Sequence, residues 1–468
     1  MGPLGRRSTA CRRHSPVDLE TQFSRFLSAD TLAPTACGSG SRERDFPLSR
    51  VFWCFIWQVL HPGAACRTVV RQLQAVCETE TRKLDENSSA YCQGRQRLPL
   101  SRVQQALRES ATAARRSCPE GIPGWKRPVK VADASCIRLP DTAENRAVYP
   151  YAGCQRPGCG FPTMKFLGLF CLASGAILNV VYDTWKTSEI RLLLRLLDQL
   201  RPDDILLGDR AFCGYFIMAK LPTLRVDVVA RLNCRRLRKP GRGRRLGPDD
   251  WLVRWDRPEA CPPYLSVEEW KDLPPYIMVR LIRSRLSRPG FRTQEVWLST
   301  TLLDPDQYPA FEIERLYLRR WEMELCLRDL KTTMGMEEMR CRSPEMVHKE
   351  LLMFLTAHNF IRCLIAQAAT AHQVPRTRIS FKGALDTAAS FHEAMRLATS
   401  KARVRQLHTR MLEIIARDLV PYRPGRAEPR AVKRRPKPYQ RLTKPRRLFH
   451  ETVHRCKPHS KVQAPCLS

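Results

Sequence analysis

Residues 129–139 read VKVADASCIRL, and this stretch decides the class of fold that the sequence predicts. Its residues alternate between apolar and polar, and it holds Val and Ile but few helix formers, so we expect a β-strand. Residues 164–171 and 176–181 are expected to form two further strands around a turn at Ser174 and Gly175. The predicted order therefore begins with three antiparallel strands.

Helices and strands are expected to alternate after the third strand. Residues 188–200 predict a helix, DILLGD at 204–209 a short buried strand, residues 211–221 a helix, and VDVVARL at 226–232 another strand. This is the order of a ribonuclease H-like α/β core. Residues 121–233 are predicted to be its first part, and residues 309–420 to complete it together with C-terminal helices.

Three other regions flank or interrupt this core. Helical periodicity over residues 1–120, including VFWCFIWQVL at 51–60, predicts a helical N-terminal domain that binds DNA, with Trp53 and Trp57 in its core. Residues 234–308 contain the β-like stretches IMVRLIRSRL and TQEVWLSTTLL and predict an inserted β-rich subdomain. The tail, residues 421–468, is basic and rich in Pro, and is predicted to be disordered.

The charge of the chain predicts a polyanionic partner, since 80 Lys and Arg against 46 Asp and Glu give a formal charge of +34. Nucleic acid is favoured over a membrane surface, because the basic residues do not lie on one amphipathic helix. No signal peptide and no transmembrane segment are predicted. The 19 cysteines form no disulfide framework and are expected to be reduced in a cytosol, and Cys154 and Cys159 lack a second pair at zinc spacing.

The run YLRRWEMELCLRDLK at 317–331 has a polar pattern that amphipathicity alone does not require. On an ideal helix, an arc of roughly 60° contains four of its polar side chains: Tyr317, Arg320, Glu324 and Lys331. Glu322 projects elsewhere. The simpler alternative is a solvated helix face on which Arg320 and Glu324 form an i,i+4 ion pair, worth about 0.2 to 0.5 kcal/mol.

Two further carboxylates stand at the ends of predicted strands, Asp133 after VKVA and Asp209 after ILLG. A turn acid for Asp133 and a helix N-cap for Asp209 are the simpler roles. In a ribonuclease H-like core, however, the first strand, the fourth strand and a late helix converge, which would bring both acids to Glu324. Three adjacent carboxylates repel unless a divalent cation neutralises them, so we expect Mg²⁺, with Mn²⁺ as a substitute. Two such ions would support in-line displacement at phosphorus.

These residues also carry a family resemblance. The spacing of Tyr317, Arg320, Glu324 and Lys331 resembles the signature of transposases of the insertion sequence four family. VADASCIRLPDTAEN followed by GCGFP resembles the first-aspartate region of that family, and LLGDRAFCGYF resembles the second. The resemblance extends from about residue 52 to the basic tail. Ala134 is a departure, because relatives usually have Gly after the first Asp.

The resemblance implies a DDE transposase in which Asp133, Asp209 and Glu324 are both the catalytic triad and the metal ligands. It implies cleavage at the ends of the element with water as nucleophile, attack by the freed 3′-hydroxyl, and a hairpin intermediate. The implied partners are the terminal inverted repeats of the element and target DNA, held by a homodimer in a synaptic complex. The expected location is the bacterial cytoplasm, in association with the nucleoid.

A basic cluster is predicted to follow the phosphate backbone, since seven of the eleven residues at 235–245 are Lys or Arg. A solvated loop is the alternative. The residues predicted to bind DNA are Tyr317, Arg320, Lys331, Arg210, Arg235, Arg236, Arg238 and Lys239. Two rival functions remain open: a catalytically inactive or domesticated DNA-binding relative, and another ribonuclease H-like nuclease.

Overall fold

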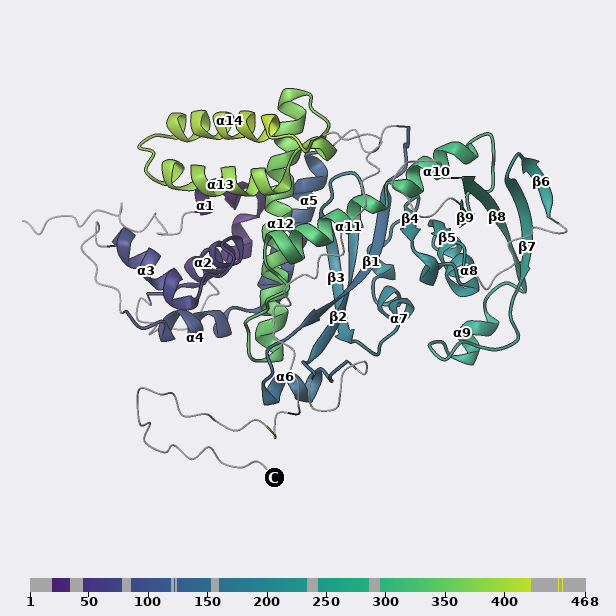
Figure 1. Ribbon diagram of the computed structural model, residues 1–468, viewed down its shortest axis with the longest axis horizontal. Helices are drawn as coiled ribbons and strands as arrows, with labels where there is room; N and C mark the ends of the chain where they lie inside the picture. The colour runs from purple at the N-terminus through teal and green to yellow at the C-terminus, as the bar shows by residue number, and fades with distance from the viewer. Residues whose placement is uncertain are drawn as a thin grey trace, which may run out of the picture.

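The structure is a computed structural model, and it describes residues 19–33, 45–77, 86–118, 124–152, 160–233, 243–285 and 295–421, with the single positions 122, 445 and 448. A mixed sheet in the order β3-β2-β1-β4-β5-β9-β8-β7-β6 runs through the molecule (Figure 1). The bounds of its strands are β1 Val129–Arg138, β2 Thr163–Cys171, β3 Ile177–Thr184, β4 Ile205–Gly208, β5 Asp227–Arg231, β6 Arg244–Gly247, β7 Asp250–Asp256, β8 Tyr276–Arg285 and β9 Glu295–Thr300.

The first five strands have the predicted order. β1 pairs antiparallel with β2, and β2 with β3, whereas β4 lies parallel to β1 and β5 parallel to β4. The turn between β2 and β3 contains Gly175 at φ +73°, a conformation that glycine adopts without a steric penalty. The predicted α/β class is therefore confirmed, and the structure adds that the strands form one large central sheet.

The strands between residues 244 and 300 extend this sheet, because β9 pairs antiparallel with both β5 and β8. Arg280 of β8 is fully buried and forms three hydrogen bonds to Asp250 of β7, from Nε to Oδ1 at 2.9 Å, from Nε to Oδ2 at 3.1 Å and from Nη2 to Oδ2 at 2.6 Å. Its Nη1 donates to the carbonyl oxygen of Tyr308 at 2.7 Å, just before the helix that begins at Ala310. One buried guanidinium thus joins the outer strands to the next helix. The division of the chain into domains stays a prediction.

Helices pack on both faces of the sheet (Figure 1). Their bounds are α1 Leu19–Phe23, α2 Leu48–Leu60, α3 Cys66–Cys77, α4 Ser89–Arg97, α5 Leu100–Arg116, α6 Ala143–Val148, α7 Glu189–Leu194, α8 Tyr215–Thr223, α9 Val267–Lys271, α10 Ala310–Leu318, α11 Trp321–Arg328, α12 Pro344–His372, α13 Phe381–Arg396 and α14 Lys401–Arg417. One core contains side chains of α5, α11 and α12, and the other contains side chains of α7 and α8. Val131 and Ala132 of β1 belong to opposite cores, as the alternation of a strand requires.

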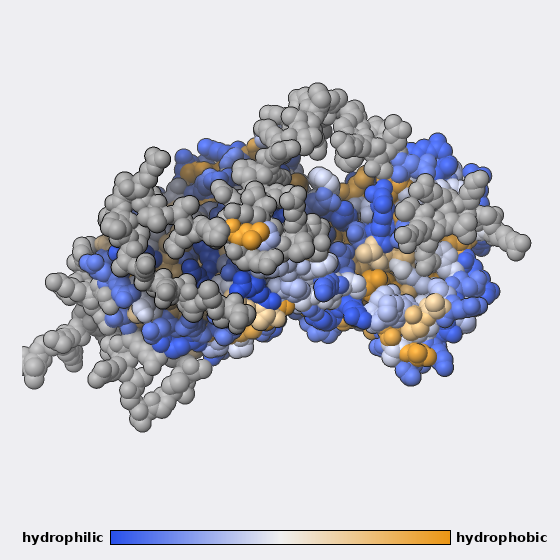
Figure 2. Space-filling view, turned by 60° about the horizontal axis from the view of Figure 1, so that its bottom comes forward, coloured by the Kyte–Doolittle hydropathy of each residue, from blue (hydrophilic) through white to orange (hydrophobic). Residues whose placement is uncertain are grey.

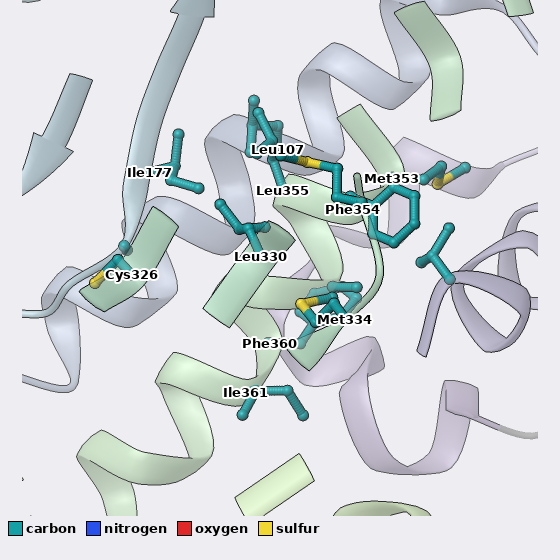
Figure 3. Packing of buried hydrophobic residues seen from close by; sticks show 14 of the residues in the cluster. Leu107, Ile177, Cys326, Leu330, Met334, Met353, Phe354, Leu355, Phe360 and Ile361 are labelled. Atoms are coloured by element: carbon teal, nitrogen blue, oxygen red, sulfur yellow. The ribbon is translucent and has the colours of Figure 1, made fainter. Parts of the chain in front are cut away.

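The N-terminal helices share a core with the sheet through α12. The ring of Phe360 in α12 stacks on Phe23 of α1, with centroids 5.0 Å apart, and lies 6.0 Å from buried Trp53 of α2. Asn359 of α12 accepts a hydrogen bond from the Ile177 amide of β3 at 2.9 Å and donates to the Ser110 hydroxyl of α5 at 3.2 Å. Figure 3 shows Leu107 of α5, Ile177 and residues of α12 in one cluster.

α12 is long and apolar enough to cross a membrane, but 89% of its apolar window is buried inside the protein, as in a core helix. On the face shown in Figure 2, the surface of the described residues is largely hydrophilic, with scattered hydrophobic side chains. Cys154, Cys159 and almost all of the tail at 421–468 lie outside the described residues.

Candidate active site

β1 and β4 place two acids at one level of the sheet. Val131 lies beside Leu207 in the parallel ladder, so Asp133 and Asp209, each two residues further along, are level with one another. Val131 and Leu207 both face the core that contains α11 and α12. Because side chains alternate along a strand, the two acids face the same way. Neighbouring strands are about 4.8 Å apart, so the two acids are neighbours.

Asp133 lies inside β1 and not at its end, because the strand continues to Arg138 in antiparallel pairing with β2. Burial raises the pKa of the Asp133 carboxyl from 3.8 to about 6; Arg320 opposes this shift, while the charges of Glu324 and Asp209 add to it. The amide of Ala134 donates to Asp133 Oδ1 at 3.1 Å. Ala134 is an ordinary strand residue without positive φ, so this position tolerates a side chain.

Asp209 also has the role of a helix N-cap, the simpler alternative that the sequence offered. The amide of Ala211 donates to Asp209 Oδ1 at 2.7 Å, at the start of the 3-10 helix Arg210–Phe212. The turn is tight: a Cβ on Gly208 would lie 2.7 Å from Phe212 Cβ, closer than real contacts allow. Gly208 therefore lets Phe212 pack over the end of β4 and fixes the position of the acid that follows.

Residues 317–331 do not form one ideal helix. α10 ends at Leu318 and α11 begins at Trp321, and the amides of Arg319 and Arg320 bond three residues back. A π-helical turn follows at Asp329–Thr333. The predicted 60° arc is therefore wrong in detail, because tightened and widened turns change the rotation per residue.

Arg320 joins the acids nonetheless. Its Nη2 lies 2.7 Å from Glu324 Oε1, and its Nη1 lies 3.9 Å from Asp133 Oδ2. It also forms a hydrogen bond with Tyr317, whose pKa is raised by burial. The i,i+4 pair expected from the sequence is thus present and is part of a larger cluster around Asp133.

The other predicted DNA-binding residues have different surroundings. Lys331 Nζ donates to the carbonyl oxygen of Cys136 at 3.0 Å, three residues beyond Asp133 on β1. Arg210 is exposed beside Asp209. Four predicted residues lie outside the described residues: Arg235, Arg236, Arg238 and Lys239.

Two charged residues near these acids were missed by sequence reasoning. Arg231 of β5 is level with Asp209, because Gly208 pairs with Ala230. Its positive charge opposes the rise in the pKa of Tyr317 that burial causes. Counting along the predicted strands would have found it. Glu189 begins α7, and burial followed by the charge of Asp209 raises its pKa. No spacing in the sequence signals Glu189, since its position depends on how α7 packs.

The donor chemistry of this site fits a divalent cation. The charges of Glu324 and Asp209 add to the rise in the pKa of Asp133 that burial causes. A cation bound among the three carboxylates would relieve this repulsion. Among the residues that the structure describes, no three His, Cys, Asp or Glu side chains are already arranged to hold a metal ion. Arg320 contacts two of the three acids and supplies positive charge there.

Two sequence comparisons with known proteins identify one family. A family model described as a transposase DDE domain matches residues 124–360, a range that contains all three acids. The transposase InsG of insertion sequence element IS4 from Escherichia coli (strain K12) is 27% identical over 438 residues, covering 90% of this chain and 93% of that protein. A solved piggyBac transposase synaptic complex with hairpin DNA has a TM-score of 0.40 at 11% identity, covering 87% of each chain.

Proposed function

Because the chain belongs to the DDE transposases of the insertion sequence four family, enzymes that act on DNA, we propose that it cuts the ends of a mobile element and joins them to target DNA. The observation that supports this proposal is that Asp133 and Asp209 lie level with one another at adjacent parallel strands. Arg320 contacts both Asp133 and Glu324, and the charge of Glu324 raises the pKa of Asp133. The strand order 3-2-1-4-5 supports a ribonuclease H-like core.

Asp133, Asp209 and Glu324 would hold two divalent cations, Mg²⁺ or Mn²⁺, which would activate water and stabilise the leaving oxygen of the phosphodiester. Arg320 would exchange its contact with Glu324 for a bidentate contact with a DNA phosphate. Tyr317 orients Arg320 in this proposal, and Lys331 adds a point charge near the cut strand. Water would attack first, and the freed 3′-hydroxyl would attack next, through a hairpin end.

The assembly that we propose is a homodimer holding two terminal inverted repeats and the target, in the bacterial cytoplasm at the nucleoid. The N-terminal helices would recognise the ends, since exposed Arg67 and Arg71 lie on α3. Deleting these helices would uncover α12, so surface substitutions are the suitable test. Arg67→Glu with Arg71→Glu should weaken binding to cognate ends; unchanged binding would contradict this assignment.

The central test uses purified protein, Mg²⁺ and DNA carrying the terminal repeats of the element. Asp133→Ala, Asp209→Ala and Glu324→Ala should each abolish cleavage while end binding persists. Glu322→Gln is the matched control, because this acid also lies on α11 but pairs with Arg319 at 2.7 Å. Cleavage that survives in the triad variants would overturn the proposal. End binding without cleavage by the unaltered chain would favour an inactive relative.

Two basic residues extend the test. Arg320→Ala and Lys331→Ala should weaken end binding or slow strand transfer, because each removes a phosphate contact in the proposed complex. Normal binding and normal strand transfer in both variants would remove these residues from the proposal and leave the triad untouched.

A further inference from the structure

A cavity of about 620 Å³ lies between the N-terminal helices and the segment that leads from α11 into α12. Its lining includes three cysteines, Cys66 at the start of α3, Cys92 of α4 and Cys341 before α12, together with Arg95 of α4. None of these four residues belongs to the candidate active site. Three thiols around one buried cation are an unusual grouping that the proposed DNA chemistry does not require.

Arg95 donates hydrogen bonds to two of these sulfurs. Its Nη1 lies 3.1 Å from Cys66 Sγ, and its Nη2 lies 2.8 Å from Cys341 Sγ. Its guanidinium carbon lies 4.1 Å from the centre of the Phe55 ring. Arg95 Nε is buried without a hydrogen-bond partner among the described residues. The positive charge of Arg95 acts on both of these sulfurs and on the buried carboxylate of Glu350.

Cys66 is the sulfur best placed to ionise. The Cys92 thiol donates a hydrogen bond to it, Arg95 contributes positive charge, and Gln58 Nε2 donates to its Sγ at 3.7 Å. These contacts outweigh burial and lower the pKa of Cys66 to about 5. As the first residue of α3, it also faces the positive end of that helix.

Cys341 has a different environment, although it contacts the same guanidinium. It is buried, and burial followed by the charge of Glu350 raises its pKa well above the usual range. The amide of Cys341 donates to Glu350 Oε2 at 3.0 Å, which holds that carboxylate near the sulfur. Cys341 therefore stays a thiol beside Arg95, and Cys66 and Cys92 are the reactive pair.

We propose that Cys66 and Cys92 form an oxidation site for small hydroperoxides, in which Cys66 is the attacking thiolate and Cys92 the resolving thiol. In the first step, Cys66 Sγ attacks one peroxide oxygen, the O–O bond breaks, and Cys66 becomes a sulfenic acid while hydroxide leaves. In the second step, Cys92 Sγ attacks Cys66 Sγ, the S–O bond breaks, the disulfide forms, and the departing hydroxide takes up the Cys92 proton and leaves as water. The two thiols lose two electrons and two protons, and hydrogen peroxide is reduced to two waters.

The surroundings of Cys92 favour the second step. Its pKa is raised chiefly because its proton is held by the Cys66 sulfur, and then by burial and the negative charge of Cys66. Formation of the sulfenic acid removes that charge, while Arg95 continues to favour the Cys92 thiolate. The first oxidation thus makes the resolving thiol more reactive.

The test uses the full chain and hydrogen peroxide, followed by peptide mapping with mass spectrometry. The unaltered protein should give a peptide pair joined by Cys66 and Cys92, two hydrogens lighter than the reduced pair. In Cys92→Ser, dimedone should label Cys66 as the sulfenic acid. In Cys66→Ser, Cys92 should remain reduced at the same peroxide dose. Cys92 oxidation that is as fast without Cys66 would overturn the proposal.

Cys261 is the matched control, because it is also half-buried but its sulfur contacts only carbonyl oxygens in the described residues, such as Pro262 O at 3.6 Å. Alkylation of Cys66 by iodoacetamide should change less than twofold between pH 8 and pH 6. Free cysteine added to the same sample, with a pKa near 8.5, should lose roughly 75-fold over this range. A loss at Cys66 as large as that of free cysteine would contradict a stabilised thiolate. Neither measurement depends on DNA cleavage, so a failure here is distinct from a failure of the proposed function.

Discussion

Replacing Asp133 by Asn is expected to stabilise the metal-free protein at neutral pH. The pKa of this carboxyl rises from 3.8 to about 6 on folding, mainly through burial. At about 1.36 kcal/mol for each pKa unit, ionising Asp133 inside the folded chain costs about 3 kcal/mol. The side chain is only 19% exposed, so solvent screening reduces this figure little. The Asn variant avoids the charge but leaves Arg320 with one partner fewer, so we expect a net gain of about 1 to 3 kcal/mol.

The sign of the pH dependence follows from the direction of the shift. Because the folded pKa is raised, the unfolded chain releases this proton first as the pH increases from about 4. The contribution of Asp133 to stability is therefore fully present below pH 3.8 and is lost as the pH rises through about 6. The advantage of Asp133→Asn should be largest at pH 7.5 and about half as large at pH 5.

The assay is urea unfolding of the wild type and Asp133→Asn with EDTA, at pH 7.5 and pH 5. A second series replaces EDTA with Mg²⁺, which should raise the urea midpoint of the wild type more than that of the variant. An Asn variant that is less stable than the wild type at pH 7.5 in EDTA would contradict a folding penalty from the buried Asp133 charge. A stability difference that is independent of pH would refute it equally.

Three further substitutions test residues that support or flank the candidate active site. Asp250→Asn leaves Arg280 buried without its ion pair and should lower the unfolding free energy by about 3 to 5 kcal/mol in urea titrations. Gly208→Ala forces Phe212 away and should cost about 1 to 3 kcal/mol in thermal melts, with slower end cleavage because Asp209 moves. Arg231→Gln should weaken binding to cognate ends and reduce the salt slope of binding by about one.

Each of these variants has a control on the same structure. Asp256→Asn removes an exposed carboxylate of β7 and should leave stability unchanged. Gly214→Ala adds a Cβ that meets nothing within 4 Å, so it should cleave normally. Arg225→Gln removes an exposed charge near the opposite end of β5, and the salt dependence of binding to cognate ends should be unchanged. A variant that behaves like its control would contradict the corresponding role.

The sequence was most informative where a local pattern has one structural solution. Alternation over residues 129–139 predicted β1, and a glycine between two apolar runs predicted the turn at Gly175. The i,i+4 pair of Arg320 and Glu324 needs only one helical turn, so the interruption before α11 did not remove it. These features depend on neighbours within a few residues.

Features that depend on packing between distant segments were not predictable in the same way. Residues 234–308 were predicted to form an inserted β-rich subdomain, but no local pattern showed that their strands would pair with β5 and continue the main sheet through β9. The π-helical turn at Asp329–Thr333 has no Pro or Gly to mark it. The contact between Arg320 and Asp133 joins residues that are remote in the sequence, and only the assembled core brings them together.

The continuity of the sheet has a mechanical consequence. β9 is hydrogen-bonded on both sides, so the outer strands and the strands that carry Asp133 and Asp209 form one stiff body without an internal hinge. The helical segment that carries Glu324 is different, because its backbone hydrogen bonds reach three residues back at residues 319–320 and five residues back in the π-helical turn at residues 329–333. We therefore expect reshaping of the site around DNA to occur in the segment that carries α11 and not in the sheet.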